Sequence, residues 1–283
     1  MRTSDTVLPI ARALAVLPAA LALSAAVTPV LADDRVRQDL EAVAGRSVYF
    51  GHQSVGSNIL DGVRDLASRE GVALRLEEVT VAAGVPAGTL AHGFVADNGE
   101  PLRKLESFQR ALASGSGKSV DIALLKFCYV DFDKGSDVRG IFARYQATVA
   151  RVKADHPGTT LVHVTAPLTG VQGGMKGALK RLLGRAPYGL AENVRREEYN
   201  ALLRQAYQGK EPVFDLARVE STRADGRTET FEWNGRPVPA LVPAYTSDGG
   251  HLNDAGRLVA ARELLAVLAA VPARTVVPPP TAR

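Results

Sequence analysis

The chain has 283 residues, a formal net charge of +4, 46% hydrophobic residues and one cysteine. The hydrophobic share excludes a disordered protein. The single cysteine excludes an internal disulfide and zinc or iron–sulfur sites built on cysteine. The length matches one large α/β domain, or at most two small ones. The basic residues are scattered and never exceed adjacent pairs, so we expect no nucleic-acid partner.

The first 32 residues predict a secretory signal peptide. Arg2 and Arg12 precede an apolar run over residues 13–27, and small or aliphatic residues up to Ala32 come before two aspartates. This order of charge, apolar run and small residues is typical of an exported protein. The alternative is an uncleaved membrane anchor. Cleavage after Ala32 would give a periplasmic or secreted protein with no stable membrane insertion.

The remaining chain alternates between predicted helices and strands. Apolar residues at helical spacing predict helices over residues 33–43, 55–68, 101–113, 138–154, 193–208 and 252–270. Short apolar or alternating runs predict strands over residues 47–50, 73–81, 122–129, 160–165 and 213–216. Strands separated by helices predict an α/β fold, a three-layer flavodoxin-like sandwich. Its parallel sheet would have about five strands, with helices on both faces.

These elements form one predicted domain over residues 33–272, followed by a Pro-rich tail, 273–283, that we expect to be disordered. Two segments do not fit the alternation. Residues 82–99 predict a long loop with four glycines, and a loop of that length is more often functional than incidental. Residues 220–246 contain a two-residue Asn-Gly turn signal, which predicts an inserted β-hairpin.

A serine follows the first predicted strand. The sequence Gly-His-Gln-Ser-Val-Gly-Ser-Asn begins at Gly51 and leads into a helix, so Ser54 stands at or just before a helix N-terminus. Backbone N–H groups and the helix dipole favour a developing anion there. A serine hydroxyl needs a base to act as a nucleophile. Ser54 is therefore either a nucleophile or only a helix N-cap.

An aspartate and a histidine precede the last predicted helix. Asp248 and His251 are separated by two glycines, and such a turn can fold the carboxylate back onto the imidazole. The aspartate would then orient the histidine, which would take a proton from serine. The alternative is that Asp248 caps the helix and His251 lies in its first turn. The pair is more specific when combined with Ser54.

These blocks resemble the SGNH hydrolases, also called GDSL-type esterases and lipases, over about residues 47–268. The Gly-His-Gln-Ser-Val-Gly block is similar to that of an exported bacterial subgroup. The resemblance implies that Ser54 is the nucleophile, His251 the general base and acid, and Asp248 the orienting carboxylate. The family motif is Gly-Asp-Ser, from which Gly-His-Gln-Ser departs.

The resemblance also implies an oxyanion hole with three donors: the Ser54 N–H, a glycine N–H and an asparagine amide. The glycine block at residues 84–89 points to Gly88. The family's Gly-x-Asn-Asp block reads Cys-Tyr-Val-Asp here, with Val130 in place of the asparagine.

A substitute for the missing amide is expected, because losing one such donor typically costs about 2.7–4 kcal/mol of transition-state stabilisation. Asn98, in the long loop, is the candidate. Asn58 is less favoured because a helix would carry it away from the serine.

Three further residues are candidates for lining the site. His52 precedes Ser54 by two residues, His92 lies in the long loop, and Lys126 interrupts an apolar strand. Each also has a structural interpretation, as an outer hydrogen-bond donor, a solvated loop residue and a partner for an acid, respectively. No two histidines have the spacing of metal ligands, so we expect no metal and no cofactor.

The sequence therefore predicts an exported serine esterase that cleaves acyl esters, with O-acetyl groups on carbohydrate among the substrates, through an acyl-enzyme. Its partner would be a small-molecule or carbohydrate ester. The alternative is a catalytically inactive protein that binds carbohydrate or acyl groups on the same fold. A flavin or phosphate binder is a third hypothesis, which no phosphate-binding motif supports.

Overall fold

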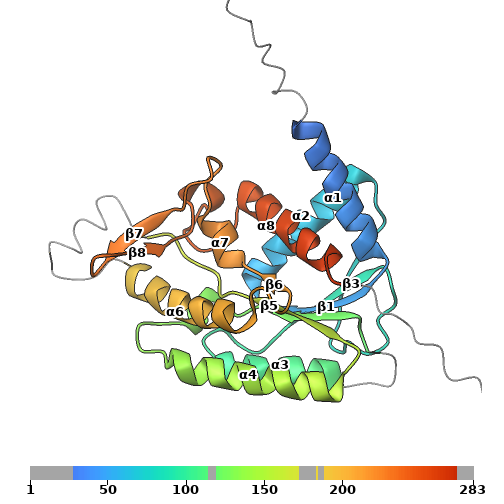
Figure 1. Ribbon diagram of the computed structural model, residues 1–283, viewed down its shortest axis with the longest axis horizontal. Helices are drawn as coiled ribbons and strands as arrows, with labels where there is room; N and C mark the ends of the chain where they lie inside the picture. The colour runs from blue at the N-terminus through green and yellow to red at the C-terminus, as the bar shows by residue number, and fades with distance from the viewer. Residues whose placement is uncertain (1–27, 114–118, 172–182, 184–187, 273–283) are drawn as a thin grey trace, which may run out of the picture.

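The computed structural model describes residues 28–113, 119–171, 183 and 188–272 (Figure 1). The first helix, α1 (Thr28–Ala44), runs through the predicted cleavage position after Ala32. The rest of the predicted signal peptide and the predicted disordered tail, residues 273–283, lie outside the described residues. Both therefore stay predictions.

The core of the molecule is a six-stranded parallel sheet. Its strands, in chain order, are β1 (Ser47–His52), β2 (Arg75–Glu78), β3 (Thr89–Phe94), β4 (Ile122–Leu125), β5 (Thr160–Val164) and β6 (Val213–Phe214). Their order across the sheet is β2-β3-β1-β4-β5-β6, and every neighbouring pair is parallel. The predicted α/β class and flavodoxin-like sandwich are confirmed.

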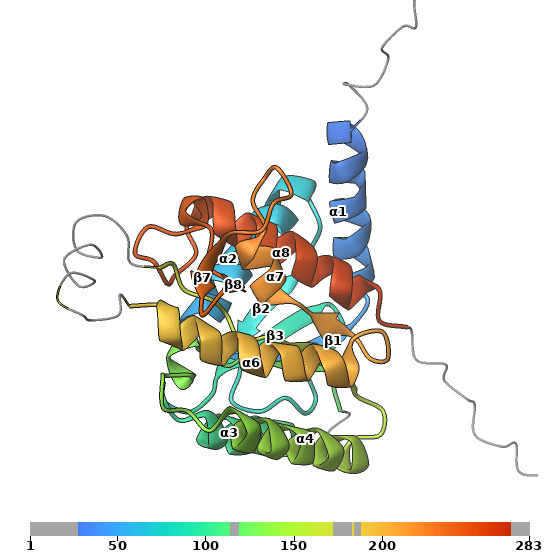
Figure 2. The same cartoon turned by 60° about the vertical axis from the view of Figure 1, so that its left-hand side comes forward.

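Helices cover both faces of this sheet (Figures 1 and 2). On one face lie α1, α2 (Ser54–Glu70), α7 (Leu216–Ser221) and α8 (Asp254–Ala269). On the other lie α3 (Pro101–Ala113), α4 (Val138–Asp155) and α6 (Leu190–Tyr207). Successive strand residues point to opposite faces, so Val48 and Phe50 join the first core and Tyr49 the second. None of the described helices is both long and apolar enough to span a membrane.

The sheet has one strand more than the sequence predicted. The additional strand, β3, lies inside the predicted loop 82–99 and pairs with both β1 and β2. It lacks the usual β-branched signal because its neighbours approach closely. A Cβ on Gly93 would lie 2.6 Å from the Val79 carbonyl oxygen and 3.1 Å from the Tyr49 hydroxyl. The predicted strand 122–129 ends at Leu125, and the chain turns into a 3-10 helix, η1 (Tyr129–Asp131).

The segment before α8 contains an antiparallel hairpin outside the main sheet. It is formed by β7 (Thr230–Trp233) and β8 (Arg236–Pro239). The turn residues Asn234 and Gly235 both have positive φ, 49° and 73°, as a type I′ turn requires. A second 3-10 helix, η2 (Pro243–Tyr245), then leads toward α8.

Candidate active site

Two helices bring distant parts of the chain together at the carboxyl edge of the sheet. A Cβ on Gly62 of α2 would lie only 2.4 Å from the Arg257 carbonyl oxygen of α8, so the glycine permits the close approach of the two helices. An ion pair of 2.8 Å joins Asp65 to Arg257 across the same contact. Because Ser54 begins α2 and His251 precedes α8, this packing sets the two residues side by side.

Ser54, His251 and Asp248 form a continuous hydrogen-bonded chain. The Ser54 Oγ lies 3.0 Å from His251 Nε2, and His251 Nδ1 lies 2.6 Å from Asp248 Oδ2. A hydrogen bond from the imidazole holds the pKa of the Asp248 carboxyl well below its usual range, with further help from backbone N–H groups. An ionised Asp248 accepts from Nδ1–H, which leaves Nε2 as the acceptor for the serine proton.

Neither Ser54 nor Asp248 is a helix cap, and His251 does not lie in the first turn of α8. The N-cap of α2 is Gln53, and Ser54 is the first residue of the helix. The N-cap of α8 is Asn253, whose side-chain oxygen accepts from two backbone N–H groups of the first turn. Asp248 instead accepts from the N–H groups of its own loop, at 2.8 Å from both Gly250 and His251.

Asn58 lies one helical turn after Ser54 on the same side of α2. Its Oδ1 accepts from the Leu252 N–H at 3.2 Å. Asn58 was the less favoured candidate for the oxyanion donor. In the structure it binds the residue next to His251, so α2 holds the histidine loop at two successive points.

The start of α2 is not capped by a side chain. Gln53 sends its amide away from the helix, where its Nε2 donates to the carbonyls of Val95 and Ala96, the latter at 2.9 Å. Neither interaction involves the first N–H groups of α2. The N–H of Ser54 therefore stands at an uncapped helix N-terminus, where partial positive charge favours an oxyanion.

The prediction that Gly88 belongs to the oxyanion hole is wrong. Gly88 precedes β3, and its N–H donates to the Arg46 carbonyl at 2.9 Å. The neighbouring Thr89 pairs with Ser47, the first residue of β1. Gly88 thus lies at the amino edge of the sheet, roughly 17 Å from the carboxyl edge at about 3.3 Å per strand residue. Its positive φ of 80° shows that it serves a turn.

Asn98 lies at the carboxyl edge, in the loop between β3 and α3. Its Oδ1 accepts from Lys104 Nζ at 3.0 Å, and Lys104 is held by both oxygens of the buried Asp131 at 2.8 Å. Asp131 also accepts from the Gly99 N–H at 2.8 Å. The same side chain of Asn98 also carries an amide NH₂, which can only donate. Val130, beside Asp131, exposes its apolar side chain to solvent.

The three residues expected to line the site have different positions. Lys126 does not line it: the side chain is completely buried and donates to the Phe127 carbonyl at 3.0 Å, and burial lowers its pKa. His52 is also completely buried and lies below the surface of the site. Its Nε2 is 3.1 Å from Nδ1 of the half-buried His92.

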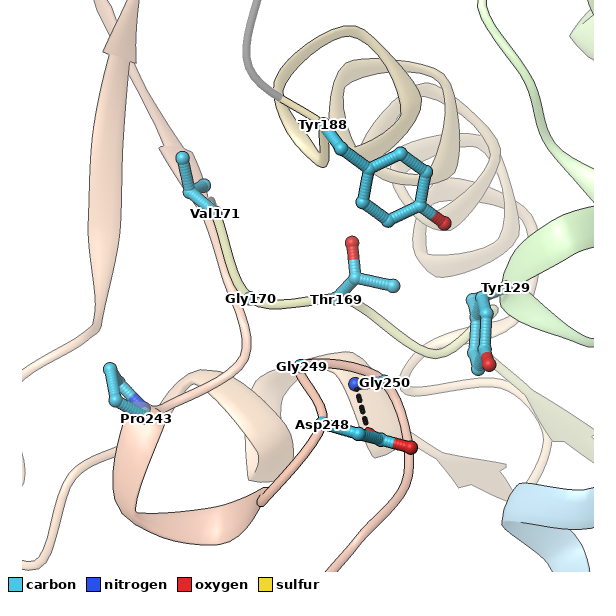
Figure 3. Close-up of a pocket in the computed structure, with 9 residues that line it drawn as sticks. All are labelled: Tyr129, Thr169, Gly170, Val171, Tyr188, Pro243, Asp248, Gly249 and Gly250. Atoms are coloured by element: carbon cyan, nitrogen blue, oxygen red, sulfur yellow. Dashed lines mark hydrogen bonds between the residues drawn. The ribbon is translucent and has the colours of Figure 1, made fainter. Parts of the chain in front are cut away.

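A cavity of about 450 Å³ opens on the Asp248 side of the triad (Figure 3). The residues that line it are Tyr129, Thr169, Gly170, Val171, Tyr188, Pro243, Asp248, Gly249 and Gly250. Ser54 and His251 do not line it. Tyr129 connects the cavity wall to the triad, because its ring packs edge-on against His251 at 5.8 Å between ring centroids.

A buried arginine supports two walls of this cavity. Arg196, on α6, donates from Nε to the Tyr129 carbonyl at 2.9 Å and from Nη1 to the Thr169 hydroxyl at 2.7 Å. Burial lowers the pKa of the guanidinium. Neither Arg196 nor Thr169 was found from the sequence, because a single arginine in an amphipathic helix carries no local signal of its partners. In the described part of the chain, no three His, Cys, Asp or Glu side chains are grouped to hold a metal.

Comparisons with known proteins give structural matches only. No protein-family profile and no curated protein matches the sequence. The solved structures similar to this chain include a protein provisionally described as a platelet activating factor from Streptococcus pneumonia (16% identity, TM-score 0.48, covering 84% of this chain and 94% of that one).

A provisionally described lipolytic protein of the G-D-S-L family from Desulfitobacterium hafniense shares 10% identity at a TM-score of 0.46, over 78% of this chain and 99% of that one. The periplasmic domain of a lipopolysaccharide acetyltransferase from Salmonella ser. Paratyphi A shares 13% identity at a TM-score of 0.41, over 84% and 96%. Likeness of this degree does not determine activity or substrate.

Proposed function

We propose that this chain is an exported serine esterase that hydrolyses acyl esters, with O-acyl groups on carbohydrate as its substrate class. The observation that carries the proposal is the continuous Ser54–His251–Asp248 hydrogen-bond chain. It lies at the carboxyl edge of a parallel sheet, where such sites form. The resemblance of the sequence blocks to SGNH hydrolases supports the same assignment.

The reaction begins when Ser54 Oγ attacks the ester carbonyl and His251 Nε2 takes the hydroxyl proton. Asp248 stabilises the resulting imidazolium. The tetrahedral oxyanion receives hydrogen bonds from the Ser54 N–H and from the amide of Asn98. His251 then gives its proton to the leaving alcohol, and an acyl-enzyme remains. Water then attacks the acyl carbonyl while His251 takes its proton, and His251 returns this proton to the Ser54 Oγ as the acid leaves.

The open position of the triad supports hydrolysis by water. The side chains of His251 and Asp248 are 41% and 57% exposed, so solvent reaches the acyl-enzyme directly. The cavity beside Asp248 supports a carbohydrate alcohol group. It presents two tyrosine rings, Tyr129 and Tyr188, together with the backbone of Gly249, and tyrosine combines an apolar face with a polar tip.

The test is labelling of the mature protein with a fluorophosphonate probe, together with cleavage of an aryl acetate. We expect wild-type labelling that disappears in Ser54→Ala and survives in Ser57→Ala, a serine of the same helix that the triad does not use. Absence of both labelling and cleavage in a folded wild-type protein would contradict the proposal. Export is tested separately, by finding the protein in the periplasmic or secreted fraction.

A second candidate function is binding of acyl or carbohydrate groups without catalysis. Val130 favours it, because an exposed valine stands where the related hydrolases have an oxyanion-hole amide. Binding of an acetylated carbohydrate by a protein that neither labels nor cleaves would support this alternative over the esterase.

A further inference from the structure

The residue that ends β1, His52, is buried directly beneath the first turn of α2. Its ring is completely inaccessible to solvent. A Cβ on Gly56 would lie 2.3 Å from the His52 Cβ and 2.4 Å from its Cγ. The glycine in this helix therefore makes room for the imidazole, which places the ring against the turn that carries Ser54.

The hydrogen bonds of His52 determine its tautomer. Its Nδ1 lies 2.9 Å from the carbonyl oxygen of Gln53, and a carbonyl oxygen only accepts. Nδ1 of His52 must therefore carry the proton. Burial lowers the pKa of His52 to about 3, so the ring is neutral and its Nε2 is an acceptor. That nitrogen then accepts a hydrogen bond from the Nδ1–H of His92, at 3.1 Å.

The carbonyl that His52 binds belongs to the same peptide unit as the N–H of Ser54. A peptide unit is planar and trans, so its C=O and N–H point in opposite directions and turn together. The Gln53 carbonyl also accepts from the N–H groups of Gly56 and Ser57, at 2.7 and 3.3 Å. The bond from His52 is a third one to the same oxygen, and it comes from a side chain that is buried in the core.

We propose that His52 is a positioning residue for the reaction: by donating Nδ1–H to the Gln53 carbonyl, it fixes the peptide plane that aims the Ser54 N–H at the oxyanion. His92 supports this role by holding the required tautomer. The side chain of Gln53 also holds this peptide unit, because its amide donates to the Ala96 carbonyl in the loop after β3. The inference rests on the proposed esterase function and adds a residue to it.

The alternative is that His52 only fills space in the core. Two substitutions separate the interpretations. Asparagine can place its amide nitrogen near the position of Nδ1, and glutamine can place it near the position of Nε2. We expect His52→Asn to keep most of the turnover. We expect His52→Gln to lower kcat by about 10- to 100-fold with little change in KM, since a misplacement of about 1 Å can cost about 100-fold.

The control is a second buried histidine, His163 of β5. It forms hydrogen bonds with Tyr145 and Glu211 and does not contact the triad. His163→Asn should lower thermal stability without changing kcat at temperatures where the protein is folded. Equal activity of His52→Asn and His52→Gln, or loss in both in proportion to their loss of stability, would overturn the proposal.

A second measurement does not depend on activity. Two-bond ¹⁵N–¹H couplings in the folded wild type should show His52 as the neutral Nδ1–H tautomer between pH 5 and 8. An Nε2–H tautomer or a charged ring would overturn the proposal. If the wild type neither labels nor cleaves esters but shows the Nδ1–H tautomer, the esterase function fails while the geometry stands.

Discussion

The two segments that meet at the triad are held in opposite ways. The nucleophile segment, residues 51–58, is supported from inside by His52, which is completely buried. In the base segment, residues 246–252, the side chains of Asp248 and His251 are exposed to solvent, and Asp248 binds mainly the N–H groups of its own loop. A change beneath Ser54 can therefore lower stability as well as activity, whereas a change at Asp248 or His251 should affect activity alone.

The strongest test of this difference is His251→Ala. We expect kcat to fall by on the order of 10⁵- to 10⁶-fold, because the serine loses its base and the leaving alcohol its acid. The free energy of unfolding should change by less than about 0.5 kcal/mol, since the side chain is exposed. Steady-state kinetics and urea unfolding measure the two effects. A large loss of stability would show that the base segment is also part of the folded core.

A smaller loss of activity is expected for Asp248→Asn, about 10⁴-fold in kcat, because an amide cannot stabilise the imidazolium and favours the wrong tautomer. The matched control is Asp254→Asn in the first turn of α8, whose side chain is 88% exposed. The control should keep wild-type turnover. Since its hydrogen bond holds the Asp248 pKa well below the usual range, this carboxylate should produce no step in activity above pH 5. Such a step would contradict the assigned pair.

Substitution of Asn98 tests whether the loop after β3 contributes an oxyanion donor to the site that the two segments form. We expect Asn98→Ala to lower kcat by about 10²- to 10³-fold, the usual effect of removing one oxyanion donor. Asn98→Asp is the matched variant, because it keeps an oxygen for Lys104 but has no amide to donate. The same loss in both variants supports the assignment. Wild-type turnover in either one would show that another group fills the oxyanion hole.

The fold class and the grouping of Ser54, Asp248 and His251 could be predicted from the sequence, because the apolar residues repeat clearly at helical spacing and each of the three residues adjoins the end of an element. Strand β3 could not be predicted, because the small residues at 91 and 93 fit between close neighbours and carry no strand pattern. The misplacement of Gly88 followed from the missed strand, because a glycine in a supposed loop proved to be the turn before a strand.

Other parts of the site could not be predicted, because they depend on contacts across the sheet. The bond between Asn58 and Leu252 joins residues 194 positions apart. The position of His52 depends on Gly56, and its Nε2 binds His92, which lies on the missed strand. A single sequence does not show which distant residues are in contact.

Glu220 of α7 is a buried group outside both segments, and its substitution should affect stability and leave turnover nearly unchanged. Its carboxyl is completely enclosed, and burial raises its pKa to about 8 from an ordinary value of 4.5. Between these two values the folded protein holds a proton that the unfolded chain has released. Stability should therefore fall as pH rises from about 4.5 to 8. Glu220→Gln removes the ionisable carboxyl, so at pH 9 this variant should unfold at higher urea concentrations than wild type.

At pH 9 the free energies of unfolding of wild type and Glu220→Gln should differ by more than about 1.4 kcal/mol, the equivalent of one pKa unit. This difference should narrow or reverse at pH 5. Glu232→Gln, in the exposed hairpin, is the control and should show no such dependence. Measuring urea unfolding of all three proteins at both pH values decides the question. A constant difference between wild type and Glu220→Gln would mean that Glu220 does not titrate in this range. The Glu220 carboxyl would then keep one protonation state from pH 5 to 9, although burial raises its pKa more than Lys126 and Arg196 lower it.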